Sequence, residues 1–260
     1  MDVYLPANRN TNTPVILLLH GGGFFAGDKS EFSPQSKQLS GKGFVVINVN
    51  YRLVNSSGLF DPPLIHKPSV IKISDQLADI KAAIGFASSK AEEWIMSKNK
   101  WVITGHSAGG TLALLYGYGK ENKDGLIKAT GNWAGATNFA FQDESEIQSL
   151  DPRIIELMYR ACGPEPINAN IHAYKAISPF WLANNGAAIP TVNIRPQFNT
   201  VYDMSDVSKQ EYKLFTNLLT SKNVINKWLE ITGADHGFSK PGNWDEVIKE
   251  TADFFRKQLE

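Results

Sequence analysis

The chain contains almost no cysteine. Cys162 is its single cysteine in 260 residues, which excludes an intramolecular disulfide and a zinc site built from several thiolates. Cys162 falls in a predicted helix, where we expect it to fill core space rather than to react. The chemistry of this protein must therefore come from other side chains.

An excess of charge and a long hydrophobic run are also missing. Lys+Arg and Asp+Glu each total 26, so the net charge is zero and nothing electrostatic favours nucleic acid or an anionic membrane as a partner. No apolar run reaches the roughly 18 residues that suggest a membrane-spanning helix, so no membrane insertion is expected. No signal peptide opens the chain, which favours a cytoplasmic location.

The most informative segment present is Gly-His-Ser-Ala-Gly at 105–109, between a strand-like run and a helical pattern. A serine on such a turn is held in a strained conformation, with its hydroxyl above the sheet edge and a helix N-terminus beneath it. Flanking glycines are needed because side chains there would collide with neighbouring elements. Ser107 is therefore the candidate nucleophile, and the alternative is a glycine-flanked turn of an ordinary βα unit.

Three successive glycines follow an apolar run near the N-terminus, at 21–23. The N–H groups of Gly22 and Gly23, with that of Ala108, are predicted to hold the oxyanion of a tetrahedral acyl intermediate. A phosphate-binding loop is the alternative, but the Gly-Lys-Ser/Thr ending and the G-x-G-x-x-G spacing are both missing. We expect His20, directly before the glycines, to support this loop rather than to act as the base.

The candidate base follows by elimination among five histidines, which are His20, His66, His106, His172 and His236. In the hydrolase arrangement the histidine comes after the serine and the acid. Of the two that follow Ser107, His172 lies in a polar stretch without a preceding strand. His236 lies in a loop after the strand-like run 227–231, and we take it as the base.

Four segments, in this order, carry a resemblance to a known family: His20-Gly21-Gly22-Gly23-Phe24 with Gly27-Asp28, Tyr51-Arg52-Leu53, Gly105-His106-Ser107-Ala108-Gly109-Gly110 and Asp235-His236-Gly237-Phe238. They resemble the α/β-hydrolase esterases, most closely the BD-FAE-like carboxylesterases, with the hormone-sensitive-lipase family beside them. The resemblance implies an α/β-hydrolase fold, a Ser-His-Asp triad, and esterase activity without a cofactor or a metal.

The third member of the triad is where the sequence departs from that family. Counting on from the strand at 190–194, where Arg195-Pro196 replaces the family's His-Gly, the acid position falls on Asn199. Counting back from the capping box Ser208-x-x-Glu211 puts the acid near Asp203. Asp206 competes, because its spacing to His236 fits the lipase-like relatives. We take Asp203 as the acid, with Asp206 as its competitor and an uncharged position as the third possibility.

The patterns predict one α/β-hydrolase domain over 1–260, with a mostly parallel central sheet. Strands are expected at 14–19, 44–49, 101–104, 129–134, 190–194 and 226–231. Helices are expected at 33–41, 74–88, 109–118, 208–221 and 243–258. Residues 137–185 break the alternation and are interpreted as a small helical cap inserted over the nucleophile.

The N-terminus leaves the location open. The resembling family usually has one or two strands before the segment with which this sequence starts. The protein is therefore expected to be either a short cytoplasmic member, or an exported one whose signal has been removed.

The function predicted is hydrolysis of small acyl, aryl or sugar-linked esters through an acyl-enzyme. An arylformamidase-like amidase is the alternative within enzymes. A non-catalytic hydrolase-fold protein that binds a small ligand is the alternative outside them, favoured only by the doubtful acid position. The natural ester and the oligomeric state do not follow from the sequence.

Overall fold

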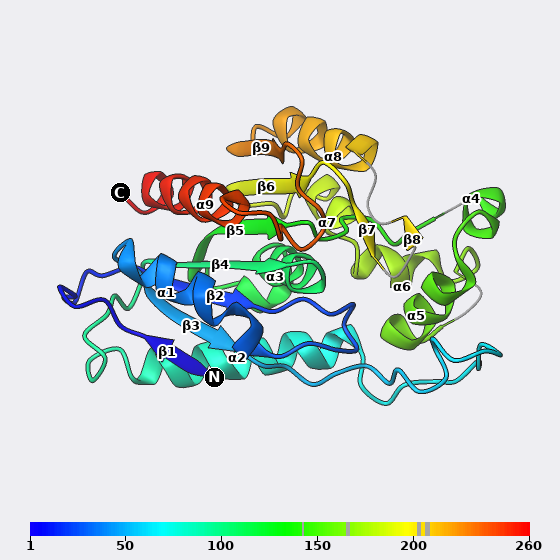
Figure 1. The fold of residues 1–260 in the computed structure, drawn as a ribbon, viewed down its shortest axis with the longest axis horizontal. Coiled ribbons are helices and arrows are strands. Elements are labelled where there is room, and N and C mark those ends of the chain that lie inside the picture. The colour runs from blue at the N-terminus through cyan, green and yellow to red at the C-terminus, as the bar shows by residue number, and fades with distance from the viewer. Residues whose placement is uncertain (142, 165–166, 202–203, 206–208) are drawn as a thin grey trace.

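The computed structural model describes residues 1–141, 143–164, 167–201, 204–205 and 209–260. Its centre is a seven-stranded sheet in the order β1-β3-β2-β4-β5-β6-β9 (Figure 1). The strands are β1 (Asp2–Tyr4), β2 (Val15–Leu19), β3 (Val45–Val49), β4 (Trp101–His106), β5 (Ile127–Trp133), β6 (Thr191–Pro196) and β9 (Asn226–Ile231). Only the pairing of β1 with β3 is antiparallel among these, which confirms the mostly parallel sheet.

The helices that flank the sheet agree closely with the predicted ranges. They are α1 (Ser33–Gly41), α2 (Ile73–Ser89), α3 (Ala108–Tyr118), α8 (Lys209–Ser221) and α9 (Asn243–Leu259). Short 3-10 turns lie at η1 (Lys29–Phe32) and η2 (Lys120–Asn122), and a separate two-stranded ribbon pairs β7 (Thr200–Val201) with β8 (Met204–Ser205). The predicted capping residue Ser208 lies outside the described residues.

Strand periodicity divides the core between the two faces of the sheet. In β2, the side chains of Val15, Leu17 and Leu19 belong to the apolar cluster that includes α2 and α3. The alternate residues Ile16 and Leu18 belong to the cluster with α1 and α9. All five residues of β2 are fully buried, as expected for a parallel strand covered by helices on both faces.

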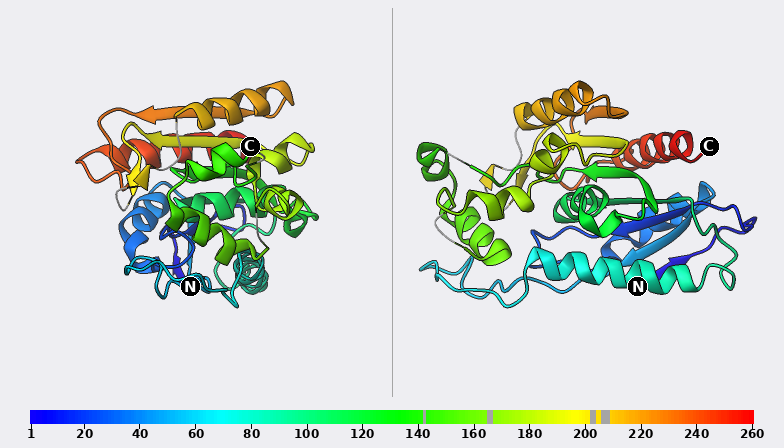
Figure 2. Two further views of the ribbon diagram at one scale, coloured as in Figure 1. Left: turned by 90° about the vertical axis from the view of Figure 1, so that its right-hand side faces the viewer. Right: turned by 180° about the vertical axis from the view of Figure 1, so that it is seen from behind.

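Four helices lie between β5 and β6, in the region predicted to depart from the alternation: α4 (Glu144–Gln148), α5 (Pro152–Cys162), α6 (Ile171–Ala176) and α7 (Pro179–Asn184). They have a small core of their own, centred on Met158, Ile167 and Tyr174. Helices α4, α5 and α6 lie together at one end of the molecule, on the right of Figure 1 and on the left of the rear view in Figure 2.

A buried arginine ties this helical segment to the loop after β3. Arg160 on α5 is fully buried and pairs with Glu156 at 2.6 Å. Its guanidinium also donates to the carbonyls of Asn55, Ser57 and Ile65. Since every partner is a charge or a carbonyl oxygen, the arginine is well satisfied in the interior, and the loop is fixed against α5.

The strand register brings five loops to one edge of the sheet. Leu19 of β2 lies opposite Gly105 of β4, His106 opposite Trp133 of β5, and Pro196 of β6 opposite Ile231 of β9. The segments that follow these carboxyl ends therefore meet at that edge, where α/β sheets place their sites. Within the described part of the chain, no helix has the length and apolar character needed to cross a bilayer.

Candidate active site

Ser107 forms the sharp turn between β4 and α3. Its backbone has φ 52° and ψ −123°, a conformation that non-glycine residues rarely adopt. Its N–H donates to the carbonyl of Trp133 at 2.7 Å, which fixes the turn against the neighbouring strand. The side chain is only half-buried, so its hydroxyl lies at the sheet edge and within reach of solvent.

The glycines beside Ser107 permit a close approach of three backbones. A Cβ at Gly109 would overlap the carbonyl oxygens of Leu19 and His20, at the end of β2. A Cβ at Gly105 would lie 2.5 Å from the carbonyl carbon of Gly109. Larger residues at either position would therefore push α3 away from the strands that support Ser107.

The glycine loop after β2 lies directly against this turn. A Cβ at Gly21 would lie 3.3 Å from the Cβ of Ser107. Gly22 and Gly23 have φ values of 106° and 59°, and the carbonyl of Gly22 accepts from Ala26 at 2.8 Å. In the described residues, no protein group accepts from the N–H of Gly22 or Gly23. Two main-chain donors beside the serine are therefore available to a ligand.

Three side chains hold the glycine loop in place. His20 is fully buried, its Nδ1 lies 2.7 Å from the carbonyl oxygen of Gly21, and its ring stacks on Tyr51 with centroids 4.2 Å apart. The Tyr51 hydroxyl donates to the carbonyl of His20 at 2.7 Å. Gln76, on α2, donates at 2.8 Å to the carbonyls of Phe24 and Arg52. Burial lowers the pKa of His20, so its ring is neutral and suited to this structural role.

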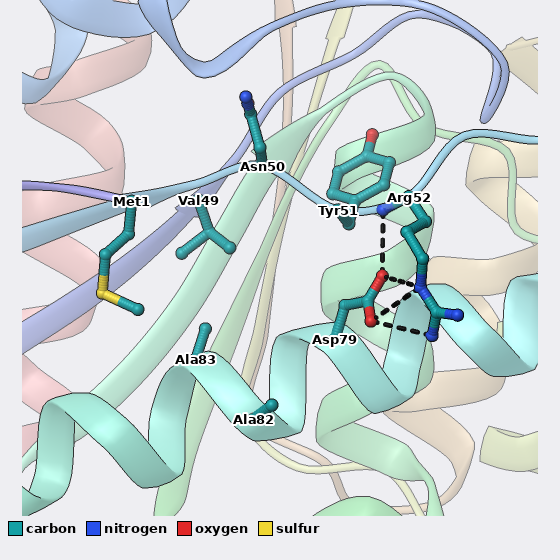
Figure 3. A pocket seen from close by; sticks show the side chains of 8 residues that line it. All are labelled: Met1, Val49, Asn50, Tyr51, Arg52, Asp79, Ala82 and Ala83. Carbon is teal, nitrogen blue, oxygen red and sulfur yellow. Dashed lines mark hydrogen bonds and ion pairs between the residues drawn. The ribbon is translucent and has the colours of Figure 1, made fainter.

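Arg52, the residue after Tyr51, anchors the segment that follows β3 to helix α2. Arg52 donates from its main chain and its Nε to the carboxylate of Asp79 on α2, at 2.9–3.0 Å (Figure 3). A surface pocket lies here, lined by Met1, Val49, Asn50, Tyr51, Arg52, Asp79, Ala82 and Ala83. None of the predicted catalytic residues lines this pocket. Tyr51 and Arg52 anchor the segment that follows β3, through their hydrogen bonds to His20 and Asp79, respectively.

His236 lies in the loop after β9, half-buried at the same sheet edge. Asp235 does not face its imidazole, because its carboxylate accepts from the main chain and the hydroxyl of Ser239. The N–H of Phe238 donates to the carbonyl of Asp235 at 2.9 Å and closes the turn. The loop is therefore a compact turn that presents the histidine side chain.

Asn199 has a side chain within hydrogen-bond distance of the imidazole of His236. Its Oδ1 lies 2.6 Å from Nδ1 of His236. The loops meet because Phe198 N–H donates to the carbonyl of Ala234 at 2.9 Å and Gly233 N–H donates to Gln197 at 2.7 Å. Asn199 is the position reached by counting on from the strand. The residues Asp203 and Asp206, favoured for the acid, lie outside the described residues.

His106 links the nucleophile turn to the loop of His236. Its Nε2 lies 2.7 Å from the carbonyl oxygen of His236, and the two rings are 4.9 Å apart. Burial, and then the proximity of His236, lower the pKa of His106 to about 3. Sequence reasoning did not anticipate this contact or those of Gln76, because the acceptors are main-chain carbonyls, which no sequence signal marks.

This arrangement defines the class of protein. A mostly parallel sheet, a serine on a strained strand–helix turn, and a histidine in the loop after the last strand are the features of an α/β-hydrolase. The family model BD-FAE matches residues 1–152, more than half of the sequence. The chain belongs to the BD-FAE family, which confirms the resemblance predicted from its motifs.

Solved structures share the fold over nearly the whole chain. A truncated carbohydrate esterase from gut microbiota aligns with a TM-score of 0.72 at 21% identity, covering 99% of this chain and 90% of that one. Esterase 2 of Thermogutta terrifontis, phosphoramylated by tabun, aligns with a TM-score of 0.71 at 20% identity, covering 98% and 88%. At such identities the likeness establishes the fold.

The curated relatives are much longer than the region they share with this chain. The probable carboxylic ester hydrolase LipM of Mycobacterium tuberculosis is 25% identical over 177 residues, which are 64% of this chain and 37% of LipM. The other curated relatives among the first matches are covered over 4–24% of their length. The chain therefore spans far less than two thirds of the curated relatives it matches.

Proposed function

We propose that this protein is a serine carboxylic-ester hydrolase that acts on small acyl, aryl or sugar-linked esters through an acyl-enzyme. Ser107 attacks the ester carbonyl, and the N–H groups of Gly22, Gly23 and Ala108 stabilise the oxyanion. His236 takes the serine proton and returns it to the leaving alcohol, and water then repeats the steps on the acyl-enzyme.

The observation that carries this proposal is the position of Ser107. It lies half-exposed on a turn with φ 52°, beside a glycine loop whose Gly22 and Gly23 N–H groups have no acceptor in the described residues. A strained serine facing free main-chain donors is the arrangement that acyl transfer requires. The solved esterases with the same fold, one of them phosphoramylated by tabun, support the same chemistry here.

The partner of His236 is part of the proposal. With Oδ1 of Asn199 accepting from Nδ1–H, the neutral imidazole is held in the tautomer whose Nε2 carries a lone pair and can accept the serine proton. An amide oxygen fixes the tautomer but supplies no full negative charge for the imidazolium that forms. We therefore assign the orientation of His236 to Asn199, while Asp203 and Asp206 stay predictions as sources of charge.

The helices between β5 and β6 fit a cap over this site. They follow β5, whose last residue lies beside the nucleophile turn through the hydrogen bond of Ser107 N–H to Trp133. Phe139, at the start of this segment, contacts Phe24 of the glycine loop with ring centroids 6.1 Å apart. An apolar wall beside the oxyanion donors suits a short acyl or aryl group.

The first experiment is intact-mass labelling with a fluorophosphonate, comparing the protein with its Ser107→Ala variant. We expect a single adduct on the protein and none on the variant, with the melting temperature of both within a few degrees. Hydrolysis of p-nitrophenyl acetate should fall by at least about 10³-fold in the variant. A protein that forms no adduct would favour the non-catalytic ligand-binding alternative.

A second experiment compares Asn199→Ala with Asp203→Asn and Asp206→Asn. We expect kcat to fall by about 10- to 100-fold for Asn199→Ala, because the imidazole loses the group that orients it. The two aspartate variants should each lose less than about 10-fold if their charges do not act on the imidazole. A much larger loss in Asp203→Asn or Asp206→Asn would identify that aspartate as the source of charge, and an unchanged kcat in Asn199→Ala would contradict the assignment to Asn199.

A further inference from the structure

A hydrogen bond that the mechanism does not use joins His106, the residue before the candidate nucleophile, to the main chain of the candidate base. His106 directly precedes Ser107, and its Nε2 lies 2.7 Å from the carbonyl oxygen of His236. A carbonyl oxygen can only accept, so Nε2 must carry the proton of this bond. A path of one peptide unit and one hydrogen bond therefore connects Ser107 to the main chain of His236.

The protonation state of His106 agrees with this bond. The residue is 8% exposed, and burial, followed by repulsion from His236, lowers its pKa to about 3, although the hydrogen bond to the His236 main chain and then Asp235 oppose the shift. At neutral pH the ring thus holds one proton, which the bond to His236 places on Nε2. Only this tautomer can hold the loop, since an unprotonated Nε2 would face the carbonyl oxygen with a lone pair.

The surroundings leave the His106 ring little freedom to turn. Phe32, Phe238 and Trp244 contact it with ring centroids 5.6–6.0 Å away, from η1, the base loop and α9. On the remaining side, a Cβ at Gly21 would lie 2.8 Å from Nδ1. A donor fixed on all sides can set the position of a loop far better than an exposed one.

We infer that His106 is a positioning residue, which fixes the main chain of His236 relative to Ser107 through the bond from its Nε2–H to the His236 carbonyl. Asn199 fixes the orientation of the His236 imidazole, and His106 fixes the position of the His236 main chain. The inference rests on the proposed roles of Ser107 and His236. It adds the requirement that the residue before Ser107 carries a neutral hydrogen-bond donor at the position that Nε2 of His106 occupies.

Two variants of similar length separate the hydrogen bond from packing. In His106→Gln the side-chain NH₂ can occupy the place of Nε2, whereas His106→Met fills similar space without a donor. We expect kcat for p-nitrophenyl acetate to fall about 10²-fold in the Met variant and less than about 10-fold in the Gln variant, because a small displacement of a base costs about this much. KM should stay within about threefold for both. His172→Met, at an exposed position of α6, is the matched control.

Equal losses of kcat in the Gln and Met variants, or losses that follow their melting temperatures, would overturn the inference and leave His106 a packing residue. A measurement on the unmutated protein covers the case in which a variant fails to fold. Long-range ¹H–¹⁵N spectra of ¹⁵N-histidine-labelled protein should show His106 neutral at pH 7, with its proton on Nε2. A proton on Nδ1 would contradict the inference and leave the proposed function standing, whereas a missing fluorophosphonate adduct would contradict the proposed function, on which the inference rests.

Discussion

The two halves of the candidate site are held by different means. On the nucleophile side, Ser107 is the single residue between β4 and α3, and the glycine loop directly follows the neighbouring strand β2. On the base side, β6 ends at Pro196 and α8 begins at Lys209, so Asn199 and the two candidate acids lie in a long connection. Short turns on central strands fix a group through backbone geometry, whereas a long connection needs specific side-chain contacts.

The contacts on the base side are of that second kind. Gln197 accepts from Gly233, Asn199 accepts from His236, and His106 donates to the His236 carbonyl. On the nucleophile side the closest contacts are between backbones, such as Gly109 with the end of β2, although the side chains of Tyr51 and Gln76 also support the glycine loop. We therefore expect the nucleophile side to fail abruptly when a Cβ is added, and the base side to weaken in steps when single hydrogen bonds are removed.

Gly22→Ala should produce the largest effect that tests this difference. A Cβ at Gly22 would overlap the carbonyl of Ala26, and φ is 106°, so the loop has to rearrange and withdraw its donors. We expect kcat for p-nitrophenyl acetate to fall by about 10²–10³-fold, the cost of an oxyanion donor. The measurement is steady-state kinetics beside thermal unfolding.

Gly43→Ala is the matched control for that substitution. Gly43 has φ 90°, but nothing lies within 4 Å of its Cβ position, and it follows α1 away from the site. It should lose about 1 kcal/mol of stability from the left-handed conformation while retaining activity. If Gly22→Ala lost no more activity than this control, or less than Asn199→Ala, the assignment of the oxyanion donors to the backbone side would fail.

The same difference explains what the sequence could and could not predict. The turn at Ser107 and the glycine loop are local, since each needs its residues within one short segment, and both carry motifs. The strand and helix ranges followed from periodicity for the same reason. The partner of His236 depends on how a long loop packs against another loop, so counting from β6 and counting from α8 named Asn199 and Asp203, respectively.

The contacts of His106 and Gln76 were beyond sequence reasoning for a related reason. His106 reaches a carbonyl 130 positions away, and Gln76 reaches carbonyls 52 and 24 positions away. A carbonyl oxygen is present at every residue, so the sequence carries no signal for which one is the acceptor. Only the assembled fold selects the partner.

Gln76→Met should have a moderate effect and tests whether the backbone side also depends on a side chain. It removes the donor to Phe24, which has φ 70° and follows the candidate oxyanion glycines, while keeping the volume of the buried side chain. We expect kcat to fall about 10-fold, as typically results from losing a supporting contact of a functional group. KM should change little, because the contact acts on the donors of the transition state.

Gln35→Met is the control for the loss of a buried amide, because Gln35 is buried on α1, which covers the other face of the sheet. Gln76→Met should lose more stability, because Gln76 donates two hydrogen bonds while Oε1 of Gln35 has no partner in the described residues, and only Gln76→Met should lose turnover. Similar kcat in the two variants would mean that the loop keeps its geometry through Val54 N–H, which donates to the same Phe24 carbonyl at 2.9 Å.

The last expected effect is on stability rather than on turnover, and concerns its pH dependence at the junction of the two halves. The pKa of His106 is about 3 in the folded protein and about 6.5 when unfolded, so the unfolded chain binds a proton there first. This contribution is complete above pH 6.5 and is lost as pH falls toward 3. Between pH 7 and pH 5 it should cost about 2 kcal/mol.

His106→Gln removes that titration, so its free energy of unfolding, measured with urea at pH 7 and pH 5, should fall by about 2 kcal/mol less than that of the unmutated protein. Burial also lowers the pKa of His20, which contributes in the same direction and is unchanged in the variant. An equal fall in both proteins would mean that His106 is already protonated near pH 6. A charged His106 could still donate from Nε2. It would, however, place a cation beside the imidazolium that His236 has to become, and so destabilise the protonated form of the base that it positions.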